Sequence, residues 1–414
     1  MTASAAHVST ADVALRDRAG RVIPGGMYGH QSAASLPPGF PQFFQRGDGC
    51  RIWDVDGNEY IDFMCGFGPI LLGYRHPAVE AAAAHQRALL DAANGPAARM
   101  VELAELLVAH TPFADWALFC KNGTDATTLC ATIARAATGR TKLLVATGAY
   151  HGAAPWCTPR LVGVTPAARA DTLTYTYNDL ASVEAALAAA DGDVAAIMVT
   201  PFRHDARFDQ ELVDLAFARG LRDLCDRTGA ALILDDVRAG FRFHLGGSWE
   251  PLGVRPDLCA YSKAIANGDA LAAVLGRDSL RSAAQQLYAT GSFWFAAVPM
   301  AAAIATITAL EAERGLAALW RAGTLLCDGL RRQADAHGLR VTLSGPAPMP
   351  FMTFAEDAAF ARANVFCGEA ARRGLYLHPW HNWFMSAALT DADIAAALER
   401  TDAAFTAVRA QCGE

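Results

Sequence analysis

The run Ala230-Ala-Leu-Ile-Leu-Asp-Asp-Val237 decides the fold of this chain. It is a short apolar run that ends in two carboxylates, which is typical of a buried strand in a parallel sheet. Runs of the same kind lie upstream at residues 117–120, 142–146 and 195–199, and segments with helical periodicity, such as Arg99–His110, alternate with them. Alternating strands and helices form βαβ units. We therefore expect an α/β fold whose sheet is mostly parallel.

The residues before this region predict a loop and a small antiparallel piece. Residues 1 to about 20 suggest an amphipathic or frayed lead-in. Residues 24–41 are rich in Pro and Gly, which fix or loosen the backbone and exclude a long helix. The turn Asp56-Gly57-Asn58 separates two alternating runs, which predicts a β-hairpin over residues 51–62.

The last third of the chain predicts a smaller α/β part. An Ala-rich helix follows Pro299, strands are expected within 339–353 and 375–386, and a closing helix begins near Asp391. A chain of 414 residues is long for one compact core. We expect residues 1–70 to contribute to a small domain, residues 71–300 to form the large domain, and residues 301–414 to complete the small one.

Composition narrows the class of partner. The chain is 53% hydrophobic and 19% charged, which is typical of a globular enzyme and not of a disordered chain. A net charge of -7 without a long basic run argues against nucleic acid, and no apolar run is long enough to span a bilayer. Small molecules are the expected ligands.

The cysteines and the N-terminal residues indicate in which cellular compartment the protein is expected. Ten cysteines are scattered from Cys50 to Cys412 without a CxxC pair or the spacing of a zinc site or disulfide framework. They are expected to be reduced core residues. Met1–Val8 lacks the basic start and apolar stretch of a secretory signal, and we expect a cytoplasmic protein.

Lys263 is the candidate catalytic residue. It is one of only three lysines, and it follows the apolar stretch 256–262 like a side chain presented at the end of a buried strand. Together with Asp235 it supplies what pyridoxal phosphate needs, an amine to form an imine and a carboxylate to keep the pyridine nitrogen protonated. The alternatives are a solvated surface lysine, and a pair of carboxylates, Asp235 and Asp236, that cap the next element.

A phosphate site is expected at Asn122-Gly123-Thr124, where a strand ends and a helix begins. Free amides of the first helical turn, a glycine that allows close approach and the Thr124 hydroxyl suit a phosphate. The same residues are also common helix caps. Tyr150, in Tyr150-His151-Gly152, suits one face of the cofactor ring. Val237 suits the other, because it lies two residues beyond Asp235 on one side of an extended chain. For both, the alternative is core packing.

These residues belong to a longer series that extends over most of the chain. The series is Pro24-Gly25-Gly26, Asp56-Gly57-Asn58, Gly68-Pro-Ile-Leu-Leu-Gly73-Tyr-Arg-His-Pro77, Asn122-Gly-Thr-Asp125, Tyr150-His-Gly152, Tyr177-Asn-Asp179, Asp235-Asp-Val237, Gly240-Phe-Arg242, and Pro256-Asp-Leu258 leading to Lys263. It resembles the class III, fold type I aminotransferases, most closely their glutamate-1-semialdehyde 2,1-aminomutase-like branch.

The resemblance implies a role for each residue. Lys263 is expected to be the Schiff-base lysine and Asp235 the pyridine partner. The expected cofactor-binding residues of the chain are Asn122, Gly123, Thr124, Tyr150, His151, Asp235 and Val237. The resemblance also implies a homodimer with the active site at the interface, in which a Gly-Thr pair of the other subunit reaches the phosphate. Here the corresponding pair is Gly291-Ser292.

Departures from the family's pattern bear on the substrate. Thr200-Pro201 replaces the usual Glu-Pro, and Ser32 stands where the aminomutases have a carboxylate-binding arginine. If a carboxylate is bound, the candidates are Arg203, Arg207 and Arg238. A true glutamate-1-semialdehyde substrate is therefore not expected.

Aromatic residues predict an apolar substrate entrance. Phe293-Trp294-Phe295 replaces small or polar residues, and a second aromatic group spans residues 378–384. With Phe67, Trp294 and Trp380 as candidate substrate residues, this entrance suits an apolar or ring-bearing amine. The alternative is packing at a dimer interface and in the small domain. His378 and His381 lack further ligands, so no metal is expected.

We therefore expect a pyridoxal-phosphate-dependent aminotransferase that moves an amino group between an amine or amino acid and a carbonyl acceptor through Lys263. The alternative is an intramolecular 2,1-amino shift of the aminomutase type. A binding protein that lost the chemistry is disfavoured because both Lys263 and Asp235 are present. A nicotinamide dehydrogenase is disfavoured because no GxGxxG follows an early strand.

Overall fold

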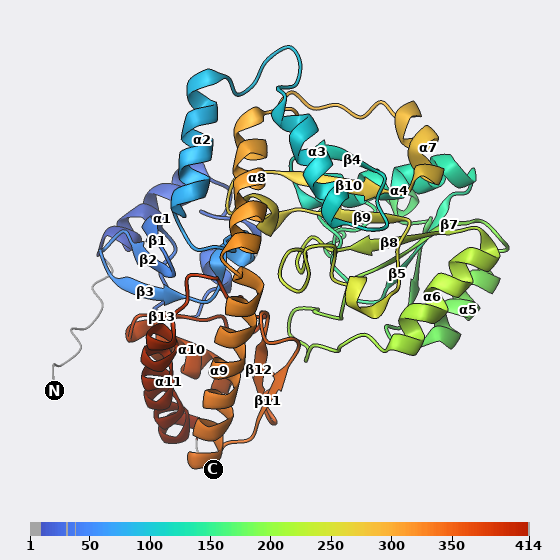
Figure 1. Ribbon diagram of the computed structural model, residues 1–414. Helices are drawn as coiled ribbons and strands as arrows, with labels where there is room; N and C mark the ends of the chain where they lie inside the picture. Colours follow the sequence, from blue (N-terminus) through green and yellow to red (C-terminus); the bar gives the residue numbers. More distant parts are fainter. Residues whose placement is uncertain (1–9, 30–31, 38, 413–414) are drawn as a thin grey trace.

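A seven-stranded sheet forms the centre of the molecule in the computed structural model, which describes residues 10–29, 32–37 and 39–412 (Figure 1). Its strands are β4 (Trp116–Cys120), β5 (Lys142–Ala146), β6 (Thr172–Tyr175), β7 (Val194–Val199), β8 (Ala231–Asp235), β9 (Leu258–Tyr261) and β10 (Ala272–Gly276). They lie in the order β4-β10-β9-β8-β7-β5-β6. Strand β10 pairs antiparallel with β4 and β9, and all other pairs in this sheet are parallel. The expected mostly parallel α/β sheet is confirmed.

Strand β8 shows why these residues form a central strand. All five of its residues are buried, and side chains alternate between the faces of a sheet. Leu232 and Leu234 join the core that includes α5 (Leu180–Ala189) and α6 (Leu215–Thr228). Ile233 joins a second core together with α4 (Gly123–Thr138). The sheet is thus covered by helices on both faces.

Further helices surround the sheet and link it to the terminal parts. They are α2 (Pro77–Leu89), α3 (Arg99–His110), α7 (Arg281–Gln286) and α8 (Ala297–Ala312). Helices α2 and α3 both pack on α8. No helix among the described residues is both long and apolar enough to cross a membrane.

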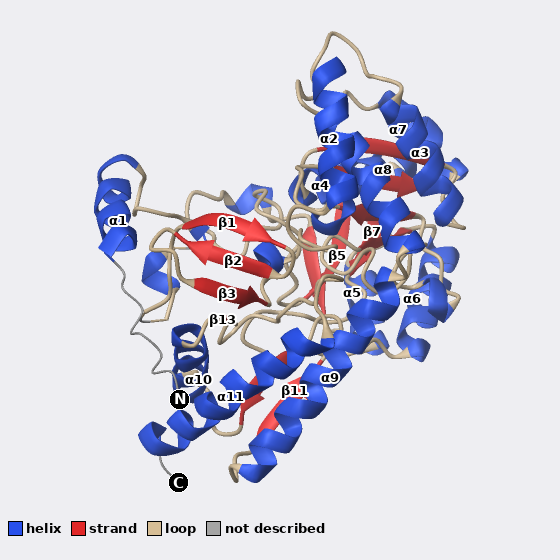
Figure 2. Ribbon diagram, turned by 60° about the vertical axis from the view of Figure 1, so that its left-hand side comes forward, coloured by secondary structure: helices blue, strands red, loops and turns tan. Residues whose placement is uncertain are grey.

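The two ends of the chain meet in a second sheet (Figures 1 and 2). Its strands are β1 (Phe44–Asp48), β2 (Arg51–Asp54), β3 (Glu59–Asp62) and β13 (Leu375–Tyr376). Strands β2 and β3 pair antiparallel, which confirms the predicted hairpin, and β13 pairs parallel with β3. The remaining elements beside this sheet are α1 (Thr10–Val22), α9 (Gly315–Ala336), β11 (Val341–Ser344), β12 (Phe351–Phe354), α10 (Ala361–Arg372) and α11 (Asp391–Cys412).

The prediction of a strand over 375–386 was wrong beyond Tyr376. The amides of Trp383 and Met385 donate to the carbonyls of Pro350 and Pro348, whereas the amide of Phe384 donates to Phe63. Because Pro348 and Pro350 have no amide N–H to donate in return, the segment cannot form a regular ladder with them. The segment 339–353 also differs from one continuous strand, since Pro346, Pro348 and Pro350 separate β11 from β12.

The lead-in is more regular than predicted, because a helix covers Thr10–Val22; residues 1–9 lie outside the described residues. The described residues of 24–41 contain no α-helix and include the short 3-10 turn Ala33–Ser35, in agreement with the predicted loop.

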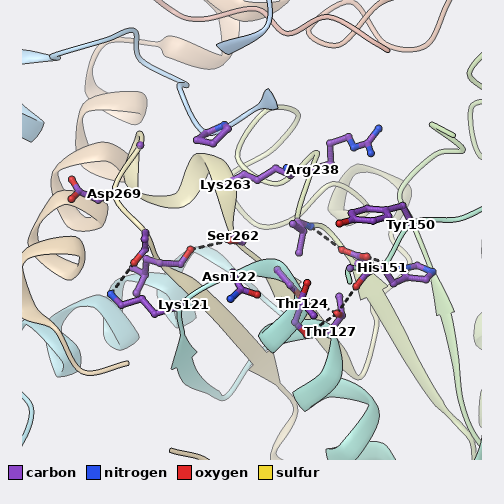
Figure 3. Close-up of a pocket in the computed structure, with 18 of the residues that line it drawn as sticks. Lys121, Asn122, Thr124, Thr127, Tyr150, His151, Arg238, Ser262, Lys263 and Asp269 are labelled. Atoms are coloured by element: carbon purple, nitrogen blue, oxygen red, sulfur yellow. Dashed lines mark hydrogen bonds and ion pairs between the residues drawn. The ribbon is translucent and has the colours of Figure 1, made fainter. Parts of the chain in front are cut away.

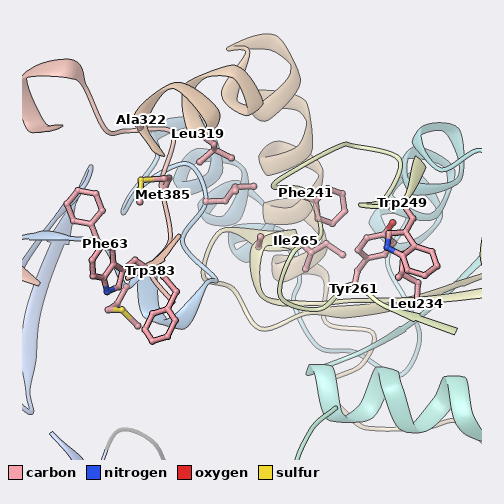
Figure 4. Close-up of a cluster of buried hydrophobic side chains, with 14 of the residues drawn as sticks. Phe63, Leu234, Phe241, Trp249, Tyr261, Ile265, Leu319, Ala322, Trp383 and Met385 are labelled. Atoms are coloured by element: carbon pink, nitrogen blue, oxygen red, sulfur yellow. The ribbon is translucent and has the colours of Figure 1, made fainter. Parts of the chain in front are cut away.

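One buried cluster connects the central sheet to the terminal parts (Figure 4). It runs from Leu234 and Trp249 through Ile265 to Leu319 and Trp383. Because this core is continuous, the expected division at residues 70 and 300 stays a prediction.

Candidate active site

A cavity of about 390 Å³ opens at the carboxyl ends of β4, β8 and β9 (Figure 3). The residues around it come from strand ends, because parallel strands present their carboxyl ends at one edge of the sheet. Eight of the predicted residues line it, namely Asn122, Gly123, Thr124, Tyr150, His151, Asp235, Val237 and Lys263. The fold therefore brings together residues up to 141 positions apart (122 to 263) in one small space.

Lys263 lies at the start of a short 3-10 turn after β9, in a left-handed backbone conformation with φ 46°. Its Nζ donates to the carbonyl of Phe67 at 3.1 Å, and the side chain is partly buried. Burial, and after it the positive charge of Arg238, lower the pKa of Lys263 to about 8 against the opposing charge of Asp235. At neutral pH about a tenth of the amine is therefore unprotonated, far more than for a solvated lysine.

Asp235 is the last residue of β8 and is only 4% exposed. Its Oδ2 accepts from His151 Nδ1 at 2.7 Å, and its Oδ1 accepts from the amide of Val237 at 3.2 Å. His151 is also buried, and Thr127 Oγ1 donates to its carbonyl at 2.7 Å. These bonds hold a carboxylate in one orientation at the floor of the cavity, where it can face a protonated ring nitrogen.

The N-terminus of α4 provides an anion site. The Asn122 side chain caps the helix, since Oδ1 accepts from the amide of Asp125 and Nδ2 donates to its carboxylate, both at 3.0 Å. Within the described residues the amides of Gly123 and Thr124 have no acceptor, as expected of a first helical turn. Thr124 Oγ1 accepts from the amide of Ala153, which leaves its own proton free to donate. Two amides and a hydroxyl are a suitable donor set for a phosphate.

Two glycines keep this site open. A Cβ on Gly123 would lie 2.7 Å from Val237 Cγ1, and a Cβ on Gly152 would lie 2.6 Å from Thr124 Oγ1. Val237 begins a turn and does not continue an extended chain, so the reason given for its position was wrong, although it does line the cavity. Tyr150 is 46% exposed and lines the cavity. Amine, carboxylate, anion site and ring-sized walls together fit pyridoxal phosphate.

Comparison with known proteins supports the interpretation that the cavity binds pyridoxal phosphate. The family model for class III aminotransferases matches residues 35–405. The chain is 51% identical to an aminopentol aminotransferase of Sphingopyxis macrogoltabida over 95% of this chain and 93% of the relative. It is 35% identical to a glutamate-1-semialdehyde 2,1-aminomutase of Roseiflexus castenholzii over 90% and 91%. The solved PLP internal aldimine form of the Sphingopyxis sp. MTA144 FumI protein superimposes with a TM-score of 0.96 at 50% identity, covering 97% of each chain.

The chain belongs to the class III aminotransferase family. It is a pyridoxal-phosphate-dependent aminotransferase with the fold type I architecture, which confirms the expected fold, cofactor and reaction class. Aminomutases are also among its relatives, at lower identity.

Four predicted residues of this aminotransferase lie outside the lining of its cavity. Ser292 and its loop are exposed. Trp294 packs on the core around α4. The Phe67 ring lies edge-on to His378 and His381, with centroids 5.9 and 5.2 Å away.

Trp380, the fourth, packs edge-on against His378 at 4.2 Å. Phe67 and Trp380 therefore belong to one cluster of rings around His378, and this cluster is linked to the cavity where the Phe67 carbonyl accepts from Lys263. Among the described residues, no group of three His, Cys, Asp or Glu side chains is placed to hold a metal ion.

The aminotransferase also uses residues that the sequence gave little reason to choose. Asn267 Oδ1 accepts from the amides of Leu71 and Leu72, and its Nδ2 donates to the carbonyl of Gly73, all at 2.8 to 2.9 Å. This bonding fixes the loop that leads from Phe67 past Lys263. His204 lines the cavity directly. Neither lies in a motif with a known spacing, so only the tertiary structure identifies them.

Proposed function

We propose that Lys263 is the residue to which this aminotransferase attaches its cofactor and that the same amine moves the proton of the substrate. The observation that carries the proposal is the position of Lys263. Its partly buried amine of lowered pKa lines the same cavity as the Asp235–His151 pair and the N-terminus of α4.

Each residue then has one task. When bound, pyridoxal phosphate supplies an electrophilic carbon and an electron sink. Asp235, held by His151, stabilises the positive charge of the ring nitrogen. Gly123, Thr124 and the start of α4 hold the phosphate, and Tyr150 and Val237 confine the ring. Lys263 Nζ, once released by the incoming amine, carries a proton to and from the substrate carbon.

The amino donor is proposed to be an apolar or ring-bearing amine. The rings of Phe67 and Trp380 both contact His378, and the backbone carbonyl of Phe67 accepts from Lys263. Ser32 stands where an arginine would bind a substrate carboxylate. A relative that is 51% identical carries the name aminopentol aminotransferase, which agrees with an amine donor. The intramolecular 2,1-amino shift remains the second candidate because aminomutases are 35% identical.

The proposal includes a cytoplasmic homodimer. Exposed apolar side chains such as Leu89, Tyr288 and Phe293 support a self-association surface, with exposed fractions of 67, 95 and 66%. All ten cysteines are free, and nine of them are buried, which suits a reducing compartment. Nucleic acid is not proposed as a partner, because the net charge is -7.

Reductive trapping tests the assignment of Lys263. The holoenzyme is treated with borohydride and its peptides are analysed by mass spectrometry. We expect the pyridoxyl label on the peptide that contains Lys263, and none on the Lys263→Ala variant. Lys121→Ala is the matched control, because Lys121 is another lysine that lines the cavity and its Nζ donates to the carbonyl of Ala270. A label on Lys121 in the wild type contradicts the proposal.

Product analysis separates the two reactions. Amino transfer and the intramolecular 2,1-amino shift both use the proposed Lys263. Only an aminotransferase stops after one turnover when no carbonyl acceptor is present. An aminomutase continues to turn over, because its intermediate stays bound between the two half-reactions.

A further inference from the structure

A second cavity, of about 370 Å³, lies against the sheet of β1, β2, β3 and β13 (Figure 2). It is almost as large as the cavity that contains Lys263, and no described residue lines both. Apolar and aromatic residues make up most of its wall, and the aromatic ones are Phe44, Phe67, Tyr74 and Tyr376. A cavity of this size and lining suits a small organic molecule.

Asp62, the last residue of β3, brings a carboxylate to this apolar cavity and is only 2% exposed. Its Oδ1 accepts from the amide of Met64 at 2.7 Å. Its Oδ2 accepts from the amide of Cys65 at 3.0 Å and from the Tyr74 hydroxyl at 2.7 Å. A carboxylate has about four acceptor positions, so these three bonds leave one position open on Oδ1.

The charge of Asp62 lacks a counter-ion. All three donors are neutral, and within the described part of the chain no Lys, Arg or His side chain forms an ion pair with this carboxylate. Burial raises the pKa of Asp62 to about 6, although the hydrogen bonds oppose the shift, so the group is mostly ionised at neutral pH. A buried charge without a partner is costly, and a cation that reaches it removes part of that cost.

Arg46 is the other charged residue of the lining, and it is turned to other partners. Its guanidinium group lies 3.9 Å from the centre of the Trp53 ring and 3.9 Å from the carboxylate of Asp48. Its side chain is 56% exposed, so solvent screens its charge. The charge that an occupant of the cavity meets away from solvent is therefore the negative charge of Asp62.

We propose that this cavity is a second ligand site, which binds an apolar or ring-bearing ammonium ion with Asp62 as the counter-ion. An ammonium N–H donates to the open position on Asp62 Oδ1, and such a charge-assisted hydrogen bond is strong. Aromatic walls attract a cation as well as an apolar body. An anion would be repelled by Asp62, and a neutral molecule would leave its charge unpaired. The inference goes beyond the proposed function, because it requires neither Lys263 nor the cofactor.

The second site and the active site share one short turn. Cys65, Gly66 and Phe67 all have positive φ, of 50, 62 and 64°. Asp62 holds the amide of Cys65 at the start of this turn, and at its end the carbonyl of Phe67 accepts from Lys263 Nζ at 3.1 Å. The two sites are therefore connected through three consecutive residues.

The test measures binding of N,N-dimethylbenzylamine to the holoenzyme by calorimetry at pH 7.5. This tertiary amine has a ring, is cationic at this pH and cannot form an imine with the cofactor. We expect benzyl alcohol, which has the ring but no charge, to bind at least about tenfold more weakly. In Asp62→Asn the Kd for the amine rises at least about tenfold, because the charge-assisted bond is lost.

A second variant leaves Asp62 and its bonds to the turn in place. Leu36→Trp puts a larger side chain into the cavity, and its Kd for the amine also rises at least about tenfold because the space is filled. Asp48→Asn is the matched control. Asp48 is a carboxylate of β1 that lies outside the lining, with its side chain 55% exposed, and the Kd of this variant stays that of the wild type.

Three results overturn the proposal. Equal Kd values in the wild type, Asp62→Asn and Leu36→Trp place the amine elsewhere. Equal affinity of the wild type for the amine and for benzyl alcohol shows that the charge of Asp62 contributes nothing. A wild type that binds no amine removes the site. Because the probe forms no imine, failure of the Lys263 proposal leaves these measurements unaffected.

Discussion

Lys263 differs from the other two lysines in its surroundings. Lys142 forms an ion pair with Asp193 at 2.8 Å, which raises its pKa. Lys121 donates to the carbonyl of Ala270 at the rim of the cavity. Burial lowers the pKa of both Lys121 and Lys263, and the pKa of Lys263 falls to about 8. Its position at the end of β9, rather than its residue type, gives this amine its lowered pKa.

This lowered pKa predicts a pH-dependent stability of the apoprotein. Lysine titrates near 10.4 in an unfolded chain and near 8 here, so between these pH values the unfolded state binds more protons and stability rises with pH. Below pH 8 the folded protein bears the full penalty of a charged Lys263. Lys263→Met therefore stabilises the apoprotein at pH 7 by on the order of 2 kcal/mol, and by almost nothing near pH 10.5.

Chemical denaturation of both apoproteins between pH 7 and pH 10.5 checks this expectation. Other groups titrate equally in the two proteins, so the difference between them isolates Lys263. Lys142→Met is the control and is not stabilising, because Lys142 keeps an ion-pair partner. A stabilisation by Lys263→Met that is the same at every pH contradicts the lowered pKa.

At the scale of elements, the sequence predicted an anion site at the junction of β4 and α4. It did not predict which of the three residues caps the helix and which donate to the anion. All three residues of Asn122-Gly123-Thr124 were expected to bind the cofactor. In the structure the Asn122 side chain bonds Asp125 on both of its polar atoms, so it acts as the helix cap. That leaves the amides of the first turn and the Thr124 hydroxyl as the donors for a phosphate.

Thr124→Val tests this junction. The variant keeps the shape of the side chain but loses the donor to the phosphate. A hydrogen bond to a charged group contributes about 1.5–3 kcal/mol, so the Kd for pyridoxal phosphate is expected to rise roughly 10- to 100-fold. Fluorescence titration of the apoenzyme measures it. Thr132→Val on the exposed part of the same helix is the control. Equal affinity in both variants places the phosphate elsewhere.

At the scale of the whole molecule, one chain supplies all the residues that line the cavity in the structure, yet part of the predicted site does not reach it. Ser292 lies on an exposed loop away from the cavity of its own chain. The proposed homodimer explains this position, since the loop is then free to reach the phosphate of the other subunit. The exposed Tyr288 and Phe293 beside it would be covered in the same interface.

Subunit complementation tests the shared site. Ser292→Glu places a negative charge where the phosphate of the other subunit is expected, and Lys263→Ala removes the reactive amine. Each homodimer is expected to be nearly inactive. A hybrid dimer contains one site with an intact Lys263 and an intact Ser292, and it recovers about half of the wild-type activity.

Ser282→Glu on α7 is the control, because Ser282 is exposed nearby and its homodimer is expected to be active. A hybrid without activity, or a monomeric mass in solution, rejects the shared site.

The sequence by itself determined the fold class, the hairpin at 51–62 and the central strands, because local apolar patterns and turn residues encode them directly. It also determined that Lys263 and Asp235 lie in one place, since each stands at the end of a buried strand and the carboxyl ends of such strands meet at one edge of the sheet. These are properties of short stretches, and short stretches are what a single sequence specifies.

Only the tertiary structure decided which long-range partners each group has. The bond of His151 to Asp235, the bonds of Asn267 to the 71–73 loop and the bonds of Arg238 to His204 and Asn382 all join residues far apart in the chain. The failed strand over 377–386 has the same cause, because two of its amides bond to Pro348 and Pro350, distant residues that have no amide N–H to donate in return. Three-dimensional packing selects these partners, and no local pattern in the sequence records the selection.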